Sequence, residues 1–116
     1  MKVLNLPHKD PIHFAKYIIL QENTFAIVKV VFQSIPSLAM VVEAAAQSSA
    51  AFNVDNTNLA FLVAIKDVKL LHQLISTEYE IRITCEYRLD NVVYFYFEVF
   101  DKNIHFVSGS LTISLQ

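Results

Sequence analysis

The middle of the chain reads Ser34-Ile-Pro-Ser-Leu-Ala-Met-Val-Val-Glu-Ala-Ala-Ala-Gln-Ser-Ser-Ala-Ala-Phe52. Serine is favoured at helix N-caps, proline is tolerated in a first turn, and the six alanines between positions 39 and 51 favour helix. Because almost every position is apolar or small, we expect a helix over 38–52 that other structure covers on nearly every side. The polar stretch 53–58 ends this predicted helix.

The segments on both sides of this helix have the patterns of strands. Residues 13–20 and 24–32 are rich in β-branched and aromatic residues, and the short polar stretch 21–23 between them indicates a hairpin. Residues 60–70 predict a long, mostly buried strand, and 79–89 alternates between apolar and polar positions without a fault. Two further strands, 92–100 and 104–115, follow after short turns.

This order, two strands, one buried helix and about four antiparallel strands, predicts an α+β fold. A curved antiparallel sheet of five to six strands wrapped around one long helix would cover the apolar sides of both, which is the layout of the hotdog fold. A helix packed on a sheet with other connectivity is the alternative. With 116 residues, we expect a single domain over 1–116.

The composition excludes several classes of function. Hydrophobic residues make up 54% of the chain and charged residues 17%, against a usual charged share of about 25%, so we expect part of the apolar surface to face another subunit. The single glycine, Gly109, excludes glycine-rich phosphate and dinucleotide loops. A net charge of −2 provides no basic surface for nucleic acid. Cys85 is the only cysteine, so we expect no internal disulfide and no cysteine-based metal cluster. We also expect no other metal and no cofactor.

The sequence also carries an expectation about location. The first ten residues have no apolar run of signal-peptide length, and the small, apolar stretch 38–52 is shorter than the about 20 residues that span a bilayer. We therefore expect a cytoplasmic protein without a membrane span.

Three segments resemble a known family. Leu6-Pro-His-Lys-Asp-Pro11 is similar to a signature near the start of the 3-hydroxyacyl-acyl-carrier-protein dehydratases, which are hotdog proteins. Val41-Val-Glu-Ala-Ala-Ala-Gln-Ser-Ser-Ala50 resembles their central helix, and Ala64-Ile-Lys-Asp-Val-Lys-Leu70 resembles the strand that follows it. The resemblance touches almost the whole chain through short motifs in a shared order.

The resemblance implies an active site between two protomers, with a helix carboxylate from one and a loop histidine from the other. The carboxylate corresponds to Glu43. The family's Gly-His-Phe-Pro-Gly loop has no counterpart, since this chain reads Val31-Phe-Gln-Ser-Ile-Pro-Ser37 before the helix. The chain thus resembles a divergent branch of the family that lacks the loop histidine.

The candidate catalytic residue is Glu43, the only charge in the predicted helix. Burial of an unpartnered carboxylate costs several kcal/mol or raises its pKa, so such a residue indicates either a function or a structural hydrogen bond. Gln47 lies one turn later, where its amide could orient the carboxylate or contact a substrate. The backbone amides near Ser37 and Leu38 could polarise a thioester carbonyl, because the N–H groups of a first turn lack intrahelical partners.

Other residues have simpler interpretations. The four histidines, at positions 8, 13, 72 and 105, have no spacing typical of a metal site or a catalytic dyad, and we expect structural or surface roles for them. Cys85 is interpreted as an inert core thiol. The aromatic residues of 94–97 could line an acyl tunnel, although ordinary packing is the commoner role of such residues.

These patterns leave three hypotheses for the function. The chain is a dehydratase-like enzyme acting through Glu43, a thioesterase in which the same carboxylate activates water or attacks the carbonyl, or a non-catalytic subunit that binds an acyl carrier. In each case the expected partner is an acyl thioester of acyl-carrier protein or coenzyme A. We also expect a homodimer or higher oligomer, with a histidine-bearing hotdog subunit as a further candidate partner.

Overall fold

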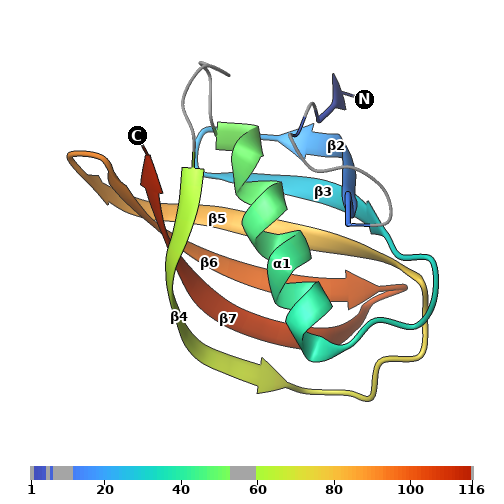
Figure 1. Cartoon of the computed structure of the whole chain (residues 1–116). Helices are drawn as coiled ribbons and strands as arrows, with labels where there is room; N and C mark the ends of the chain where they lie inside the picture. The colour runs from blue at the N-terminus through green and yellow to red at the C-terminus, as the bar shows by residue number, and fades with distance from the viewer. Residues whose placement is uncertain (1, 5, 7–11, 53–59, 116) are drawn as a thin grey trace.

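The computed structural model describes residues 2–4, 6, 12–52 and 60–115. One helix lies across one face of a curved antiparallel sheet (Figure 1). The elements follow one another as β1 (Lys2–Val3), β2 (Ala15–Gln21), β3 (Phe25–Val31), α1 (Leu38–Ser48), the 3-10 turn η1 (Ser49–Phe52), β4 (Ala60–Leu70), β5 (Glu78–Leu89), β6 (Val92–Asp101) and β7 (Ile104–Leu115). The strand order in the sheet is β1-β2-β3-β5-β6-β7-β4.

The predicted strands are present with bounds that differ by at most a few residues. The sheet has seven strands rather than five to six, because the two-residue β1 pairs with β2 and joins the edge. The core lies between α1 and the sheet face that it covers. Its largest fully buried side chains are Tyr79, Phe97 and Phe106, and the ring of Tyr79 meets the ring of Phe106 edge-on at 5.2 Å.

The helix is shorter than predicted. Regular α-helix ends at Ser48, and the chain continues as a 3-10 turn to Phe52. The hydroxyl groups of Ser48 and Ser49 donate to the carbonyl oxygens of Ala44 and Ala46, at 2.8 and 2.6 Å. Such bonds from serine back to the preceding turn compete with regular helix geometry, which explains why the alanine-rich pattern overestimated the length.

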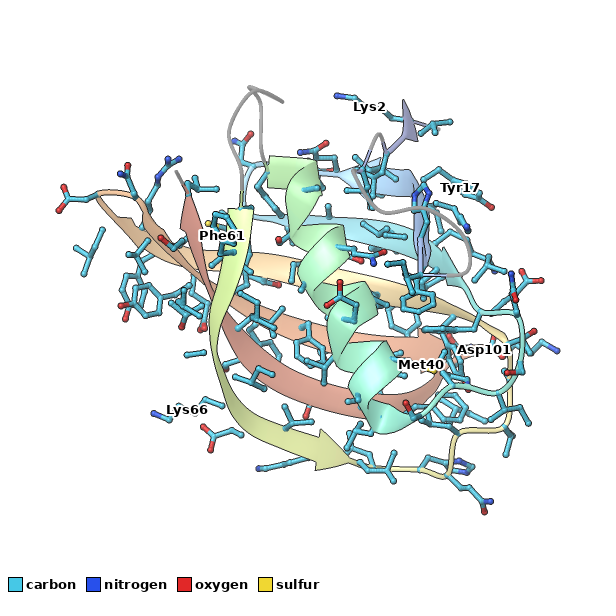
Figure 2. The ribbon with its side chains drawn as sticks, viewed as in Figure 1. Lys2, Tyr17, Met40, Phe61, Lys66 and Asp101 are labelled. Atoms are coloured by element: carbon cyan, nitrogen blue, oxygen red, sulfur yellow. The ribbon has the colours of Figure 1, made fainter. Side chains whose placement is uncertain are left out.

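The helix is also less completely covered than predicted. Val41, Ala44 and Ala45 are fully buried against the sheet, whereas Ala39 is exposed and Glu43 is half-buried. Met40, in the first turn of α1, is also half-buried (Figure 2). One side of α1 therefore remains partly exposed to solvent in the protomer.

The prediction that 60–70 forms a mostly buried strand is wrong for the protomer. β4 is exposed at every position except the half-buried Val68, because the strand lies at the edge of the sheet and pairs only with β7 among the described elements. Its exposed side chains are nevertheless apolar at Phe61, Leu62, Val63 and Ile65. In the described part of the chain, no helix has the length and apolar character needed to cross a membrane.

The hairpin between β6 and β7 turns without glycine. Lys102 and Asn103, its two central residues, have φ values of 49° and 68°. Positive φ at both central positions matches the right-handed twist of the strands on either side, but it strains residues with a side chain.

Candidate functional site

The candidate site is centred on Glu43, in the middle of α1. The helix begins as the sequence predicts, because the Ser37 hydroxyl caps it by accepting a hydrogen bond from the N–H of Met40 at 3.2 Å. The carboxylate of Glu43 is half-buried on the partly open side of the helix. Its Oε1 atom accepts a hydrogen bond from Nε2 of Gln47 at 3.3 Å. The predicted pairing of these two side chains one turn apart is thus present.

Gln47 makes three further hydrogen bonds, all to the backbone at the start of β2. Its Oε1 atom accepts from the N–H groups of Phe14 and Ala15, at 2.8 and 3.1 Å. Its Nε2 atom donates to the carbonyl oxygen of Ile12 at 2.7 Å. Only 3% of Gln47 is exposed. The side chain therefore ties the helix to a segment more than 30 residues earlier in the sequence.

These four bonds use the hydrogen-bonding capacity of the Gln47 amide. A primary amide has two N–H donors and two acceptor lone pairs, and in this structure both donors and both acceptor positions have protein partners. The arrangement suits a residue that holds Glu43 in place. The other predicted role of Gln47, direct contact with a substrate, stays a prediction.

His13 lies between two of the residues that Gln47 binds. Its backbone carbonyl accepts a hydrogen bond from the ammonium group of Lys16. The Nε2 atom of its ring is buried and has no hydrogen-bond partner within the described structure. A buried ring nitrogen without a partner is unusual in a folded protein and requires an explanation such as a ligand, a water molecule or a role in proton transfer.

The backbone amides near Ser37 and Leu38, which the sequence predicts to bind a carbonyl, lie at the start of α1, and that role stays a prediction. The cap takes up the N–H groups of Met40 and Val41, which bind the Ser37 hydroxyl and carbonyl oxygens. The N–H groups of Leu38 and Ala39 precede this pattern and point out of the first turn. Leu38 and Glu43 are separated by about 7.5 Å along the helix axis, at 1.5 Å per residue.

The remaining candidates lie apart from this site. Cys85 is half-buried in β5, and burial raises the pKa of its thiol above the ordinary value, while the nearby Arg88 lowers it to a smaller extent. His72 packs edge-on against Phe106 at 5.1 Å, and His105 lies 3.8 Å from Glu98. His8 lies outside the described residues. Among the described side chains, no three metal-ligating groups gather at one place.

Comparison with known proteins identifies the fold. The structure superposes on the dehydratase heterocomplex ApeI:P from Xenorhabdus doucetiae with a TM-score of 0.75, covering 96% of this chain and 88% of that one at 14% identity. The chain has the hotdog fold. The hotdog architecture predicted from the order of strands and helix is thereby confirmed.

Two further solved structures have the same architecture as this hotdog chain. A hypothetical thioesterase with coenzyme A from Streptococcus pneumoniae superposes with a TM-score of 0.68, at 10% identity over 85% of this chain and 84% of that one. A sigma28-regulated virulence protein from Campylobacter jejuni gives 0.75, at 12% identity over 99% and 93%. The sequence itself matches no protein-family model and no curated protein.

Sequence reasoning missed the contacts that join the site to the rest of the hotdog domain. The side chain of Gln47 bonds backbone atoms of Ile12, Phe14 and Ala15. Every residue has such backbone groups, so the sequence does not indicate which of them will be bound. The orphaned ring nitrogen of His13 likewise depends on the packing around it. For the Gln47 bonds, the only signal in the sequence was the presence of a polar amide in an otherwise apolar helix.

Proposed function

We propose that this chain binds an acyl thioester, as a homodimer, and uses Glu43 as its reacting carboxylate. One arrangement carries the proposal. The only charged side chain of α1 is half-buried and hydrogen-bonded to an amide that is itself fixed by three backbone groups. A carboxylate held in this way is positioned for proton transfer to a bound ligand.

The reaction that we favour is the dehydration of a 3-hydroxyacyl thioester. A base removes the proton alpha to the thioester carbonyl, and the carboxylic acid of Glu43 protonates the β-hydroxyl group as it leaves. The products are a 2-enoyl thioester and water. The base is a histidine, supplied by His13 of the same chain or by a histidine-bearing partner subunit, and the solved dehydratase heterocomplex supports the latter arrangement by analogy.

The second candidate is thioester hydrolysis, which the geometry of the helix start favours. Here Glu43 activates a water molecule or attacks the carbonyl itself, and the N–H groups of Leu38 and Ala39 bind the oxyanion. The products are a carboxylic acid and the free thiol. The solved thioesterase with coenzyme A supports this candidate by fold alone. In the third candidate, a non-catalytic acyl-carrier binding subunit, the chain binds the thioester without turnover, consistent with a pre-helix loop that lacks histidine.

The homodimer rests on β4. This eleven-residue strand lies at the sheet edge, and its exposed side chains Phe61, Val63 and Ile65 are 49%, 57% and 50% exposed. A long, apolar edge strand readily pairs with another strand, and proteins usually protect such an edge. Antiparallel pairing with β4 of a second copy would join the two sheets and cover these side chains.

Turnover assays with matched variants test the proposal. The purified protein is incubated with 3-hydroxyacyl and saturated acyl thioesters of coenzyme A and of acyl-carrier protein, and products are followed by mass spectrometry. Loss of water identifies the dehydratase, and release of free thiol identifies the thioesterase. Glu43→Gln keeps an acceptor for the Gln47 amide, so we expect the fold and binding to survive while turnover falls about 100-fold or more.

The control is Glu22→Gln, in the exposed turn between β2 and β3, which should leave turnover unchanged. Thermal stabilisation by acyl thioesters without turnover would support the non-catalytic candidate. Absence of both turnover and ligand-induced stabilisation would contradict acyl-thioester binding in any form.

A further inference from the structure

One buried polar atom in the neighbourhood of Glu43 has no partner within the described structure. It is Nε2 of His13, and among the described residues that are at least half-buried, no other buried side-chain nitrogen or oxygen lacks a hydrogen bond. His13 as a whole is half-buried. Because Nε2 lies at the end of the ring away from the backbone, its burial means that the ring points into the protein. Folded proteins rarely leave such an atom unpaired, so we expect a bound molecule to pair with it.

The backbone around His13 is fixed on both sides. The Gln47 amide binds the carbonyl oxygen before His13 and the N–H group after it, at 2.7 and 2.8 Å. The ammonium group of Lys16 binds the carbonyl oxygen of His13 itself. A side chain that a fixed backbone carries is held in position for a ligand, and such positioning favours catalysis.

Gln47 also brings His13 close to Glu43. Its amide nitrogen binds both the carbonyl before His13 and Oε1 of Glu43, at 2.7 and 3.3 Å. With about 2.8 Å between a carbonyl oxygen and the next Cα, the Cα of His13 lies within about 9 Å of that carboxylate oxygen. A base and an acid that act on adjacent carbons of one substrate need a separation of about 8 Å or less, with contacts near 3 Å at each end. The backbone position of His13 therefore allows its ring to act on the same ligand as Glu43.

The two other histidines that the structure describes lack these properties. His72 is exposed, and its Nδ1 atom lies 3.1 Å from the carbonyl oxygen of Gln73. His105 is also exposed, and its Nδ1 atom lies 3.8 Å from the carboxylate of Glu98. Among the described histidines, His13 is thus the one suited to take a proton from a ligand beside Glu43.

We propose that His13 is the catalytic base of the dehydration and that it acts with Glu43 of the same chain. This inference rests on the proposed function. Nε2 of His13 takes the proton alpha to the thioester carbonyl, and the electron pair of that C–H bond forms the new C–C double bond. The bond from the β-carbon to its hydroxyl group breaks, and the hydroxyl leaves as water with the proton of the Glu43 carboxylic acid. Transfer of one proton from His13 to Glu43, through solvent, restores the starting state.

A same-chain pair gives the short pre-helix loop a simple interpretation. The family resemblance implies that the histidine comes from a loop of the other protomer, and this chain has no histidine in the corresponding stretch 31–37. A base at the start of β2 replaces that histidine from a different part of the fold. The site then needs no reacting side chain from a partner subunit.

Single variants test the role of His13. On a 3-hydroxyacyl thioester of coenzyme A, we expect His13→Gln to lower kcat about 100-fold or more with little change in KM. His105→Gln is the matched control and should leave kcat unchanged, because that histidine is exposed beside Glu98. Circular dichroism checks the fold of each variant, and His13→Asn repeats the test should His13→Gln fold poorly.

Mixed dimers test whether the pair lies in one chain. Two differently tagged chains are coexpressed and purified through both tags in turn. A dimer of the wild type with the double variant His13→Gln/Glu43→Gln keeps one chain with both residues, so we expect about half of the wild-type turnover from its two equivalent positions. A dimer of His13→Gln with Glu43→Gln has no such chain, so we expect no turnover. A pair shared across the interface would reverse these two results.

The outcomes separate this inference from the proposed function. A wild type without turnover would overturn the dehydration and, with it, the role of His13. Wild-type turnover that survives in both His13→Gln and His13→Asn would overturn His13 as the base and leave the dehydration standing. Turnover in the dimer of the two single variants would overturn the same-chain pair. Turnover by a monomeric wild type would support that pair directly.

Discussion

Phe97 of β6 lies directly against the backbone of Gly109 in β7, its partner in the strand register. A methyl group on Gly109 would meet Cε1 and Cζ of the Phe97 ring at 2.9 Å and Cγ2 of Val68 at 3.0 Å. The only glycine of the chain thus serves close packing in the middle of the sheet rather than a turn.

We expect Gly109→Ala to lower the free energy of unfolding by about 1–3 kcal/mol, because the added methyl group has no space in a packed core. Urea denaturation measures the effect. The double variant Gly109→Ala with Phe97→Leu removes the ring that the methyl group meets, so its loss should be smaller than the sum of the two single losses. Additive losses would contradict a direct clash.

The Gln47 amide supports a second prediction, about stability. Gln47→Leu leaves the buried N–H groups of Phe14 and Ala15 without their acceptor and removes the part-buried bond to the Ile12 carbonyl, so we expect a loss of about 2–4 kcal/mol in urea denaturation. The matched control is Gln21→Leu, because the side chain of Gln21 is exposed and, among the described atoms, bonds the Ala51 carbonyl only. Its loss should stay below about 1 kcal/mol. Equal losses of unfolding free energy in the two variants would contradict a larger contribution from the buried hydrogen bonds of Gln47.

The turn between β6 and β7 predicts a stabilising change. Lys102→Asn combined with Asn103→Gly supplies residues that tolerate the observed positive φ values, so we expect the free energy of unfolding to rise by about 1 kcal/mol. Asn23→Gly is the control, since φ is not positive there, and it should give no gain. A fall in stability for the turn variant would contradict the assigned turn geometry.

The raised pKa of Cys85 predicts slow thiol chemistry. Burial keeps the thiol protonated, so alkylation by iodoacetamide near pH 8 should be slower in the folded protein than in urea. Because the folded pKa lies above the unfolded value, the contribution to stability is complete below the unfolded pKa and is lost as the pH rises through the folded pKa. Cys85→Val should remove this alkaline loss. As the chain has one cysteine, mass spectrometry reads its modification directly.

The β4 edge predicts a change in assembly. Ile65→Lys places a charge on the part of the strand that we expect to pair, so light scattering should report monomers. Leu70→Lys is the control, because Leu70 is similarly exposed, at 53% against 50%, but lies beyond the irregular stretch of the strand. Monomers from both variants would place the contact over the whole strand, and dimers from both would exclude β4.

Apolar periodicity and helix-capping residues predicted most of the fold, because the burial of a strand face and the start of a helix depend mainly on neighbouring residues. The alternation of 79–89 correctly predicted a strand, β5, and its first half has Tyr79, Ile81 and Ile83 fully buried. The second half is a correction, because a register shift between Cys85 and Tyr87 leaves Tyr87 and Leu89 exposed rather than in the core. Ser37 caps α1 as predicted. The prediction that 60–70 is buried within the protomer was wrong. An apolar pattern predicts that a strand will be covered, but it does not distinguish cover by the same chain from cover by a second copy.

The candidate site was only partly predictable. The spacing of Glu43 and Gln47 placed both on one helix face, and the structure joins them. The hydrogen bonds from Gln47 to the start of β2 join segments more than 30 residues apart. Local sequence periodicity does not predict contacts between such distant segments.

The stacked rings of Tyr87 and Tyr94 have a practical consequence. The chain contains five tyrosines and no tryptophan, so its ultraviolet emission is not dominated by indole. Two of those five fluorophores share one solvent-facing stack, which makes the intrinsic signal a label-free optical readout of whatever touches that side of the molecule.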